Sequence, residues 1–335
     1  MDGRRIVAVL AAVVAVVAAS VGVASVVRHD APAAAELVQP DQHVTGLASF
    51  LEAPEPEPQP DPVPDRGSPP DPVPDPDRRA AFVERFPTQD AAEPGTGAGE
   101  DDWAVLVGIN EHLGGVPDNV ASAQDAERLR ALLLREGWSD DRIVLLTDTE
   151  ATGEMIREAL AWLERKAGGD SRVVFHFSGH SKKWYGAGGT ITDQALWPTD
   201  DDFVRREELA EALGAVDHDA FWGNVAACEA AGFSLPGVTA PGRVWTFSSA
   251  ADEKSYEDPQ ADHSVWGRFL LDQGMWQHDD APPVQHAFAD AAPNAAEYTS
   301  LQVPYGPQRP VLVDDLGEPF DLTAVPARIT PPMGQ

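Results

Sequence analysis

Short apolar runs alternate with amphipathic segments between residues 103 and 247, and this alternation restricts the fold more than any other feature of the chain. The runs are continuous enough to be strands buried on both faces, and they lie at residues 103–109, 142–146, 173–177, 221–227 and 243–247. The segments expected to be helices are 121–136, 152–166 and 205–213. Strands that alternate with helices form a mostly parallel sheet covered by helices, so the sequence predicts an α/β fold.

Two of these runs end in residues that can carry chemistry. His180 comes soon after the run 173–177, and Cys228, the only cysteine of the chain, directly follows the run 221–227. Sites in parallel sheets form outside the carboxyl ends of the strands. A thiol becomes a useful nucleophile when a nearby base takes its proton, and histidine is the usual base. We therefore expect His180 and Cys228 to form a catalytic dyad; the alternative is an inert buried thiol beside an incidental histidine.

Composition excludes some functions and permits others. The chain has 55 acidic and 24 basic residues, with a formal net charge of -31. Binding to phosphate groups needs clustered Lys and Arg, so nucleic acid is not an expected partner. A single cysteine cannot form an internal disulfide, and the 43% of hydrophobic residues is ample for one large core after residue 102.

The N-terminal region, residues 1–28, is expected to be a transmembrane anchor. Residues 6–27 carry no charge and are numerous enough to span a bilayer. The apolar core of a signal peptide is shorter, which favours an uncleaved anchor over a signal peptide cut near Ala24 to release a secreted protein. Arg4 and Arg5 before the span, against Arg28 after it, predict that the rest of the chain lies outside the cytoplasm; the reversed topology is the alternative.

Residues 29–101 are rich in proline and acidic residues. The sequence Pro-Asp-Pro-Val-Pro-Asp occurs at both 60–65 and 70–75. Such a composition favours an extended, semi-rigid polyproline spacer with no core of its own. We therefore predict a disordered linker at 29–101, a folded domain at 102–322 and a short tail at 323–335.

Several segments resemble the caspase and metacaspase superfamily (peptidase family C14, clan CD), most closely its bacterial metacaspase-like branch. The similar segments are residues 105–110, 123–132, 170–180, 196–200, 207–209, 248–257 and 308–310. The resemblance covers residues 103–322 and implies a caspase-like three-layer sandwich. It also implies a cysteine endopeptidase that acts on peptide or protein substrates and requires no cofactor.

The resemblance assigns roles to the residues at the two strand ends. Cys228 attacks the scissile carbonyl, and His180 acts as general base and then as general acid. The backbone N–H groups of Ser181 and Cys228 form the oxyanion hole. Ser181 stands where the family usually has glycine, but a backbone N–H can keep this role.

The sequence leaves open which type of substrate residue, P1, precedes the scissile bond. Ala226 replaces the aspartate that helps metacaspases bind a basic P1 side chain. Asp252 and Glu253, followed by Glu257 and Asp258, lie where the family places substrate-contacting loops. A basic P1 residue bound by these acids and a small or apolar P1 residue therefore remain as alternatives. A basic preference would make residues 182–183 and 78–79 candidate self-cleavage sites.

An acidic cluster at Asp200, Asp201 and Asp202, with Asp193, lies near the predicted site. Calcium activates many metacaspases, and calcium prefers several carboxylate oxygens. We expect an acidic surface loop, with calcium as an activator the alternative. His176 and His180 have a spacing that suits a metal on a helix, but on a strand they lie too far apart to share one, so no metal site is expected there.

These observations predict a membrane-anchored cysteine endopeptidase displayed on a proline-rich stalk. The competing interpretation is a catalytically inactive caspase-like domain that serves as a membrane-displayed protein-interaction module. Reaction of the thiol with iodoacetamide and cleavage of any peptide separate the two.

Overall fold

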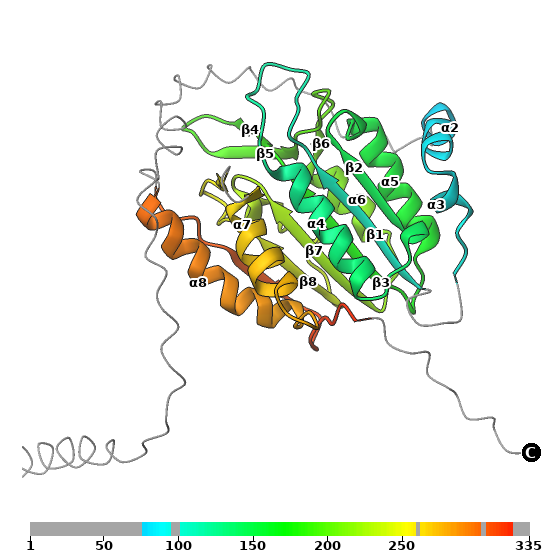
Figure 1. Ribbon diagram of the computed structural model, residues 1–335. Coiled ribbons are helices and arrows are strands. Elements are labelled where there is room, and N and C mark those ends of the chain that lie inside the picture. Colours follow the sequence, from blue (N-terminus) through cyan, green and yellow to red (C-terminus); the bar gives the residue numbers. More distant parts are fainter. Residues whose placement is uncertain (1–75, 95–100, 259–261, 303–305, 324–335) are drawn as a thin grey trace, which may run out of the picture. The chain divides into compact units, whose positions relative to one another are not determined.

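A six-stranded sheet forms the centre of the fold (Figure 1). The computed structural model describes residues 76–94, 101–258, 262–302 and 306–323, all within one unit, residues 49–335. The strand order is β11-β8-β7-β3-β1-β2, and only β11 runs antiparallel to its neighbour. The strands are β1 (Asp102–Gly108), β2 (Ile143–Thr147), β3 (Arg172–Ser178), β7 (Ala220–Ala226), β8 (Arg243–Phe247) and β11 (Val311–Asp314).

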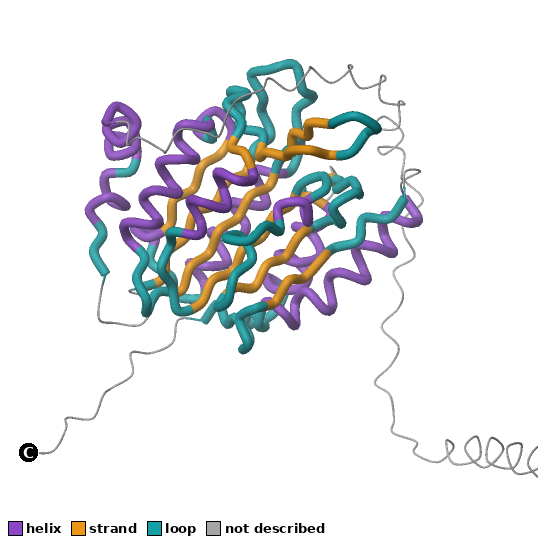
Figure 2. The backbone as a smooth tube through the Cα atoms, turned by 180° about the vertical axis from the view of Figure 1, so that it is seen from behind, coloured by secondary structure: helices purple, strands orange, loops and turns teal. Residues whose placement is uncertain are grey.

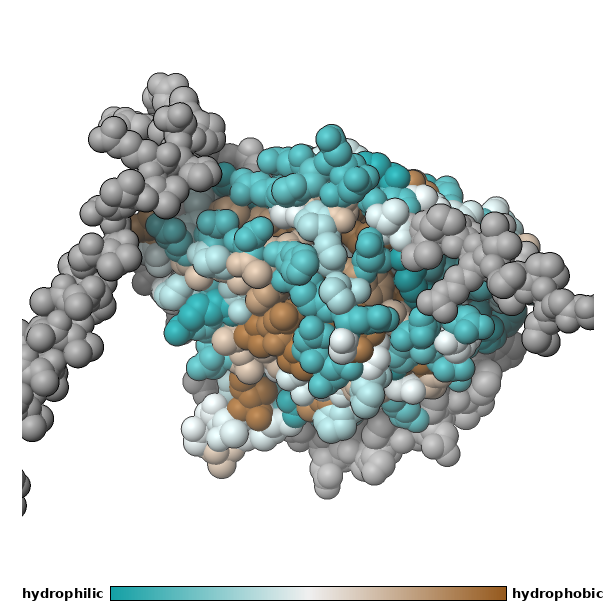
Figure 3. All heavy atoms as spheres, turned by 90° about the horizontal axis from the view of Figure 1, so that it is seen from below, coloured by the Kyte–Doolittle hydropathy of each residue, from teal (hydrophilic) through white to brown (hydrophobic). Residues whose placement is uncertain are grey.

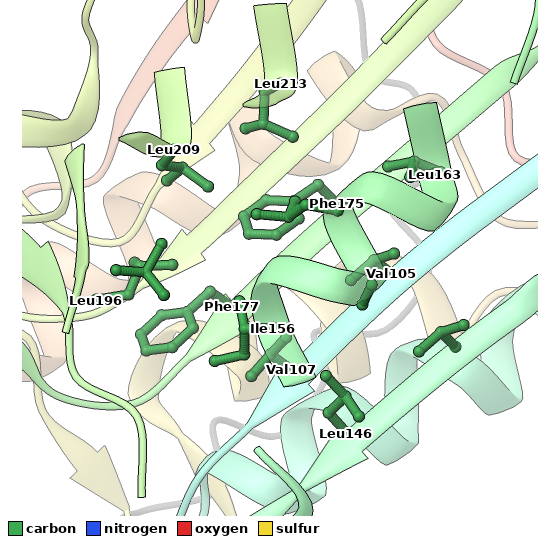
Figure 4. Close-up of a cluster of buried hydrophobic side chains, with 14 of the residues drawn as sticks. Val105, Val107, Leu146, Ile156, Leu163, Phe175, Phe177, Leu196, Leu209 and Leu213 are labelled. Atoms are coloured by element: carbon green, nitrogen blue, oxygen red, sulfur yellow. The ribbon is translucent and has the colours of Figure 1, made fainter. Parts of the chain in front are cut away.

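Helices cover both faces of this sheet (Figures 1 and 2). Successive side chains of β1 point to opposite faces, so Val105 and Val107 belong to one hydrophobic cluster and Ala104 and Leu106 to the other. The first cluster, drawn in Figure 4, is covered by α5 (Gly153–Lys166) and α6 (Arg206–Gly214). The second is covered by α4 (Ser122–Arg135), α7 (Val265–Gly267), the π-helix Arg268–Trp276 and α8 (Val284–Gln302). The predicted α/β architecture, a mostly parallel sheet flanked by helices, is confirmed.

Helices α4, α5 and α6 begin and end close to the predicted positions for local reasons, whereas the sequence analysis did not predict the other described helices. Thr152 precedes α5, and its hydroxyl accepts a hydrogen bond from Met155 N at 3.1 Å, which satisfies one free N–H of the first turn. Helix α4 packs closely on the end of β1, where a Cβ on Gly108 would lie 2.4 Å from the Ser122 carbonyl oxygen.

On the face shown in Figure 3, hydrophilic residues surround limited hydrophobic areas, as on most folded domains.

Two small antiparallel sheets interrupt the βα alternation, and the sequence did not predict them. One has the order β4-β5-β6, formed by Ser181–Tyr185, Ile191–Leu196 and Val204–Arg205. The other pairs β9 (Glu257–Asp258) with β10 (His263–Ser264). Because β4 starts just after β3 ends, the first small sheet extends from the edge at which the parallel strands end.

The linker prediction was wrong for residues 76–94. Helices α2 (Pro76–Arg85) and α3 (Pro87–Ala91) form there, and Phe82 is fully buried with its ring 6.3 Å from that of Trp162. Lys166 of α5 donates to the carbonyl oxygens of Asp90 and Ala92 at 2.7 and 2.6 Å. A proline-rich composition predicts disorder, but both helices begin at a proline, the position where its missing N–H costs no helical hydrogen bond.

Other predictions fall on residues outside the described ranges. They include the anchor at 1–28, the linker residues 29–75 and 95–100, and the tail from residue 324. Among the residues that the structure does describe, no helix is both long and apolar enough to cross a membrane.

Candidate active site

Strand pairing brings the two predicted catalytic residues to the same edge of the sheet. Strands β3 and β7 are parallel neighbours with Ser178 opposite Ala226, so His180 and Cys228 each lie two residues beyond a matched pair. Gly179 N donates to the Ala226 carbonyl oxygen at 3.1 Å. Ser181 Oγ donates to the Cys228 carbonyl oxygen at 2.7 Å. The turns that carry the histidine and the cysteine are therefore hydrogen-bonded to each other.

A backbone carbonyl determines which nitrogen of His180 carries the proton. His180 Nε2 lies 2.8 Å from the Pro117 carbonyl oxygen. A carbonyl only accepts hydrogen bonds, so Nε2 donates and Nδ1 keeps its lone pair. Burial lowers the pKa of His180; the bond to Pro117 opposes this shift, and the charge of Lys254 adds to it. The ring is consequently neutral at neutral pH, the form that can accept a proton.

The loop that carries Pro117, residues 109–120, is held by groups from distant parts of the chain. Asp148 Oδ1 accepts from the backbone N–H groups of Asn110 and Glu111 at 2.7 and 3.0 Å. Thr199 Oγ1 donates to the Glu111 carbonyl oxygen at 2.8 Å. Glu257 accepts from the N–H groups of Val120 and Ala121, and thus closes the other end of the loop.

A second histidine lies beside the first, which the sequence analysis missed. The rings of His112 and His180 have centroids 5.1 Å apart, and Trp197 lies 6.1 Å from His180 and 6.4 Å from His112. Burial lowers the pKa of His112, and repulsion between the protonated forms of the two rings lowers it further. The only signal in the sequence was that His112 follows the β1 run by a few residues.

Two serines hold the turn that carries Cys228. Ser248 Oγ accepts from Ala227 N, and Ser249 Oγ accepts from Ala230 N, both at 3.1 Å. Both hydroxyls also lie 3.1 Å from the Ala227 carbonyl oxygen. Cys228 Sγ is 3.7 Å from the Ser255 carbonyl oxygen. Burial raises the pKa of the thiol, and the neighbouring carboxylate raises it further.

That neighbouring carboxylate belongs to Glu229, which has a left-handed backbone with a φ of 51°. Its side chain is 5% exposed, and its Oε1 lies 2.7 Å from Lys183 Nζ and 3.7 Å from Lys254 Nζ. Burial lowers the pKa of Lys183, but the hydrogen bond and charge of Glu229 outweigh burial and raise the pKa above its usual value. The sequence showed Glu229 only as a departure from the family pattern and gave no sign of these lysines.

Part of the chain is similar to known proteins. Residues 101–262 match the family model described as Caspase domain. The domain that these residues form belongs to the caspase and metacaspase superfamily. The chain is 29% identical to Metacaspase-6 of Arabidopsis thaliana over 126 residues, which is 35% of this chain and 34% of that protein. It is 35% identical to Metacaspase-3 of the same plant over 107 residues, 29% of either chain.

The caspase domain is also similar in fold to the crystal structure of a protein from Geobacter sulfurreducens. The TM-score is 0.54 at 12% identity, over 67% of this chain and 99% of that one, a likeness that concerns the fold alone. The present chain spans about a third of the length of the curated relatives named above. Its membership of a cysteine-protease family is therefore shown through the domain and not through the whole length of those relatives.

The caspase domain does not gather the predicted substrate-binding acids into an open cluster. Ala226 is 5% exposed and packs in the second hydrophobic cluster, so its methyl group belongs to the core. Glu253 pairs with Arg309 at 2.5 Å, and Glu257 is used by the 109–120 loop. Asp258 pairs with Arg268 at 2.7 Å, and only Asp252 of the predicted set is exposed.

The predicted calcium carboxylates also point to separate partners. Asp200 accepts from Gly153 N at 3.0 Å, Asp201 from Trp197 Nε1 at 2.7 Å, and Asp202 pairs with Arg157 at 2.6 Å. Asp193 pairs with Arg205. Within residues 76–94, 101–258, 262–302 and 306–323, no group of three or more His, Cys, Asp or Glu side chains could hold a metal ion. Calcium dependence remains a prediction that only a binding or activity measurement tests.

Three other features of the structure take no part in the proposed dyad. His176 is fully buried within β3, where its Nδ1 contacts Asn224 Nδ2 at 2.9 Å. A cavity of about 550 Å³ opens at the β2 edge and is lined by neither His180 nor Cys228. Residues 78–79 lie in α2 and residues 182–183 in β4, so both candidate self-cleavage sites would have to leave regular structure before cleavage.

Proposed function

We propose that this chain is a cysteine endopeptidase in which Cys228 is the nucleophile and His180 is the general base. The observation that carries the proposal is the pairing of β3 with β7, which puts both residues just beyond Ser178 and Ala226 at one edge of the sheet. The Pro117 carbonyl supports it, because it fixes the proton on Nε2 and leaves Nδ1 for the thiol.

The proposed reaction begins with a neutral pair. The raised pKa of Cys228 and the lowered pKa of His180 favour a thiol and a neutral imidazole before substrate binds. Nδ1 takes the thiol proton as the sulfur attacks the scissile carbonyl, and the same proton passes to the leaving amine. A water molecule, deprotonated by His180, then cleaves the thioester and regenerates the thiol.

The oxyanion formed during attack needs donors, and the N–H groups of Cys228 and Ser181 are the proposed ones. In the turn 227–231, the N–H groups of residues 227, 229, 230 and 231 each have an acceptor. None of the described residues accepts from Cys228 N in the same way. This arrangement supports Cys228 N as a donor available to substrate.

The test is hydrolysis of a fluorogenic peptide library with varied P1 residues by the full-length chain. We expect turnover that disappears in Cys228→Ala and in His180→Ala. His176→Gln is the matched control, because this histidine is buried within β3, the strand that precedes His180, and away from the edge that carries the dyad. Turnover that persists in Cys228→Ala rules out the proposed nucleophile.

The inactive interaction module is the second candidate. Two observations favour it: the thiol pKa is raised by burial and by Glu229, and Ala226 offers no charged group to substrate. In that case Cys228 reacts slowly with iodoacetamide even at high pH, and no library peptide is cleaved. Rapid alkylation together with cleavage excludes it.

We also propose that residues 6–27 anchor the protein in a membrane with the caspase domain outside the cytoplasm. The support is their uncharged composition and the placement of Arg4, Arg5 and Arg28. Carbonate extraction separates an anchored chain from a cleaved, secreted one. Protease digestion of intact cells distinguishes the two orientations, because only an external caspase domain is degraded.

A further inference from the structure

A cavity of about 550 Å³ lies beside β2, the outermost strand at one end of the central sheet (Figure 1). Residues of helices α2 and α3, of strand β2 and of the turn 148–150 line most of it. Its volume falls within the range of about 300–1,000 Å³ in which proteins bind ligands. Since neither His180 nor Cys228 lines it, the cavity is a candidate binding site outside the proposed dyad.

Strand β2 presents free backbone groups to this cavity. Val144 and Leu146 are fully buried, and buried backbone polar groups are almost always hydrogen-bonded, so both residues face β1. Because successive residues of a strand direct their N–H and C=O to opposite sides, those of Leu145 point away from β1. In the described part of the chain, no group outside β1 bonds to the backbone of residues 144–146. Leu145 is half-buried and lines the cavity, so its N–H and C=O are available to an added strand.

The charged side chains around the cavity are mostly negative. Four carboxylates line it against two guanidinium groups. The carboxylates belong to Glu111, Asp140, Asp148 and Glu150, and the guanidinium groups to Arg85 and Arg130. Arg85 already pairs with Glu150, and Arg130 with Asp140. The Glu111 side chain is exposed, and no residue of the described ranges pairs with its carboxylate, so the charge of the cavity favours a basic ligand.

The charge and the open strand edge together restrict what can occupy this site. The proline-rich segment of the same chain fits poorly, because residues 52–75 hold seven acidic residues and one basic residue, and their prolines have no N–H to donate. A second copy of the chain would bring the same negative edge. A segment of another protein with basic side chains and free N–H groups fits both features.

We propose that the outer edge of β2 and this cavity form a docking site for an extended, basic segment of a partner protein. The segment adds to the sheet as a strand beside β2, with backbone hydrogen bonds to Leu145 and with Lys or Arg side chains directed to the carboxylates. Glu111 belongs to the loop 109–120, so the docked segment contacts the loop that carries Pro117. The docking site does not depend on the proposed peptidase activity, and binding alone tests it.

The probe is a fluorescent peptide of about six residues in which Lys alternates with Val, long enough to cover the five residues of β2. Titration with the full-length protein, followed by fluorescence anisotropy, should give saturable binding. A peptide of the same sequence with every backbone nitrogen methylated keeps the charge but cannot donate a hydrogen bond to Leu145. We expect the methylated peptide to bind about tenfold more weakly.

Variants of the protein test the charge and the strand edge separately. Glu111→Gln should weaken binding about threefold, the scale of one exposed charge pair. Glu164→Gln is the matched control, because Glu164 is exposed on α5 and does not line the cavity, and it should leave the affinity unchanged. Thr147→Lys places a cation on the edge of β2 and should weaken binding more than Glu111→Gln does, whereas the uncharged Thr147→Val should change it little. Circular dichroism checks that each variant is folded.

Three results overturn the proposal. Equal affinity for the two peptides, or an equal loss in Glu111→Gln and Glu164→Gln, would show that the net charge of -31 attracts the peptide without strand addition. Absence of saturable binding would show that the edge does not accept a basic strand. A dimer in sedimentation velocity that dissociates in Thr147→Lys would assign the edge to a second copy of the chain.

Discussion

The two halves of the proposed dyad are built differently. On the histidine side, the orientation of His180 depends on one carbonyl, that of Pro117, in a loop held by hydrogen bonds to Asp148 and Thr199. On the cysteine side, the turn is held by buried serines and by the buried pair of Glu229 with Lys183. The base can therefore be displaced while the sheet stays folded, whereas the nucleophile cannot be moved without disturbing the core.

The largest expected effect is a loss of stability when the buried ion pair on the cysteine side is broken. Glu229→Gln leaves the Lys183 ammonium, 10% exposed, beside a neutral amide. Removal of one partner from a buried ion pair is strongly destabilising, so we expect the free energy of unfolding to fall by about 4 kcal/mol in chemical denaturation. The double variant with Lys183→Met removes both charges and should recover most of the loss. Equal losses in the single and double variants would show that the charge pair does not hold the turn.

The second largest effect concerns the paired strands β3 and β7, which precede His180 and Cys228. His176 of β3 faces Asn224 of β7 in the register, and Asn224 Oδ1 in turn accepts from Thr246 Oγ1 at 2.8 Å and from Trp266 Nε1 at 2.9 Å. Burial lowers the pKa of His176 from 6.5 to about 4. Between these two values the unfolded chain binds a proton that the folded chain does not, so stability is lost as the pH falls through this window.

The loss from His176 should reach about 3 kcal/mol at pH 4, at about 1.4 kcal/mol per unit of pKa shift. Denaturation curves measured at several pH values between 7 and 4 give the slope. His176→Gln keeps a group able to bond Asn224 but cannot titrate, so its curve should be flatter in this range. Parallel curves for the two proteins would assign the acid loss to other groups.

A substitution on the histidine side should reduce activity more than stability. Asp148→Ala removes the acceptor of two backbone N–H groups and places alanine at a φ of 48°, which alanine tolerates poorly. We expect the kcat/KM for peptide cleavage to fall about tenfold, equivalent to about 1.4 kcal/mol of transition-state stabilisation. Asp148→Asn retains an acceptor oxygen and suits the left-handed backbone, so it should lose less.

Two readouts determine on which side Asp148 acts. At a pH high enough to ionise the thiol without help from a base, the rate of Cys228 alkylation should stay the same in Asp148→Ala, because the cysteine turn is held by Ser248 and Ser249. A parallel fall in alkylation and cleavage would contradict the separation of the two sides.

Residues local to a strand were predictable, and contacts between distant segments were not. The apolar runs that end near His180 and at Cys228 are sufficient to place both at the carboxyl ends of strands, because burial on both faces leaves a continuous hydrophobic pattern. Pro117 is 63 residues from His180, and Glu257 is 137 residues from Val120, so no local pattern records either contact. The acids at 252–258 are visible in the sequence, but their partners, such as Arg309 and Arg268, could not be known from composition.

The smallest expected effect is that of calcium. A calcium ion at the acidic cluster would act on the histidine side alone. Asp200, Asp201 and Asp202 adjoin Thr199, whose hydroxyl holds the Glu111 carbonyl in the loop that carries Pro117. Since these carboxylates already bind Gly153 N, Trp197 and Arg157, calcium would have to displace those partners, and we expect the cleavage rate to be the same with calcium or with a chelator. Activation by calcium would contradict this expectation. If it left Cys228 alkylation unchanged and disappeared in Asp200→Asn, the ion would be acting through Thr199 on the orientation of His180.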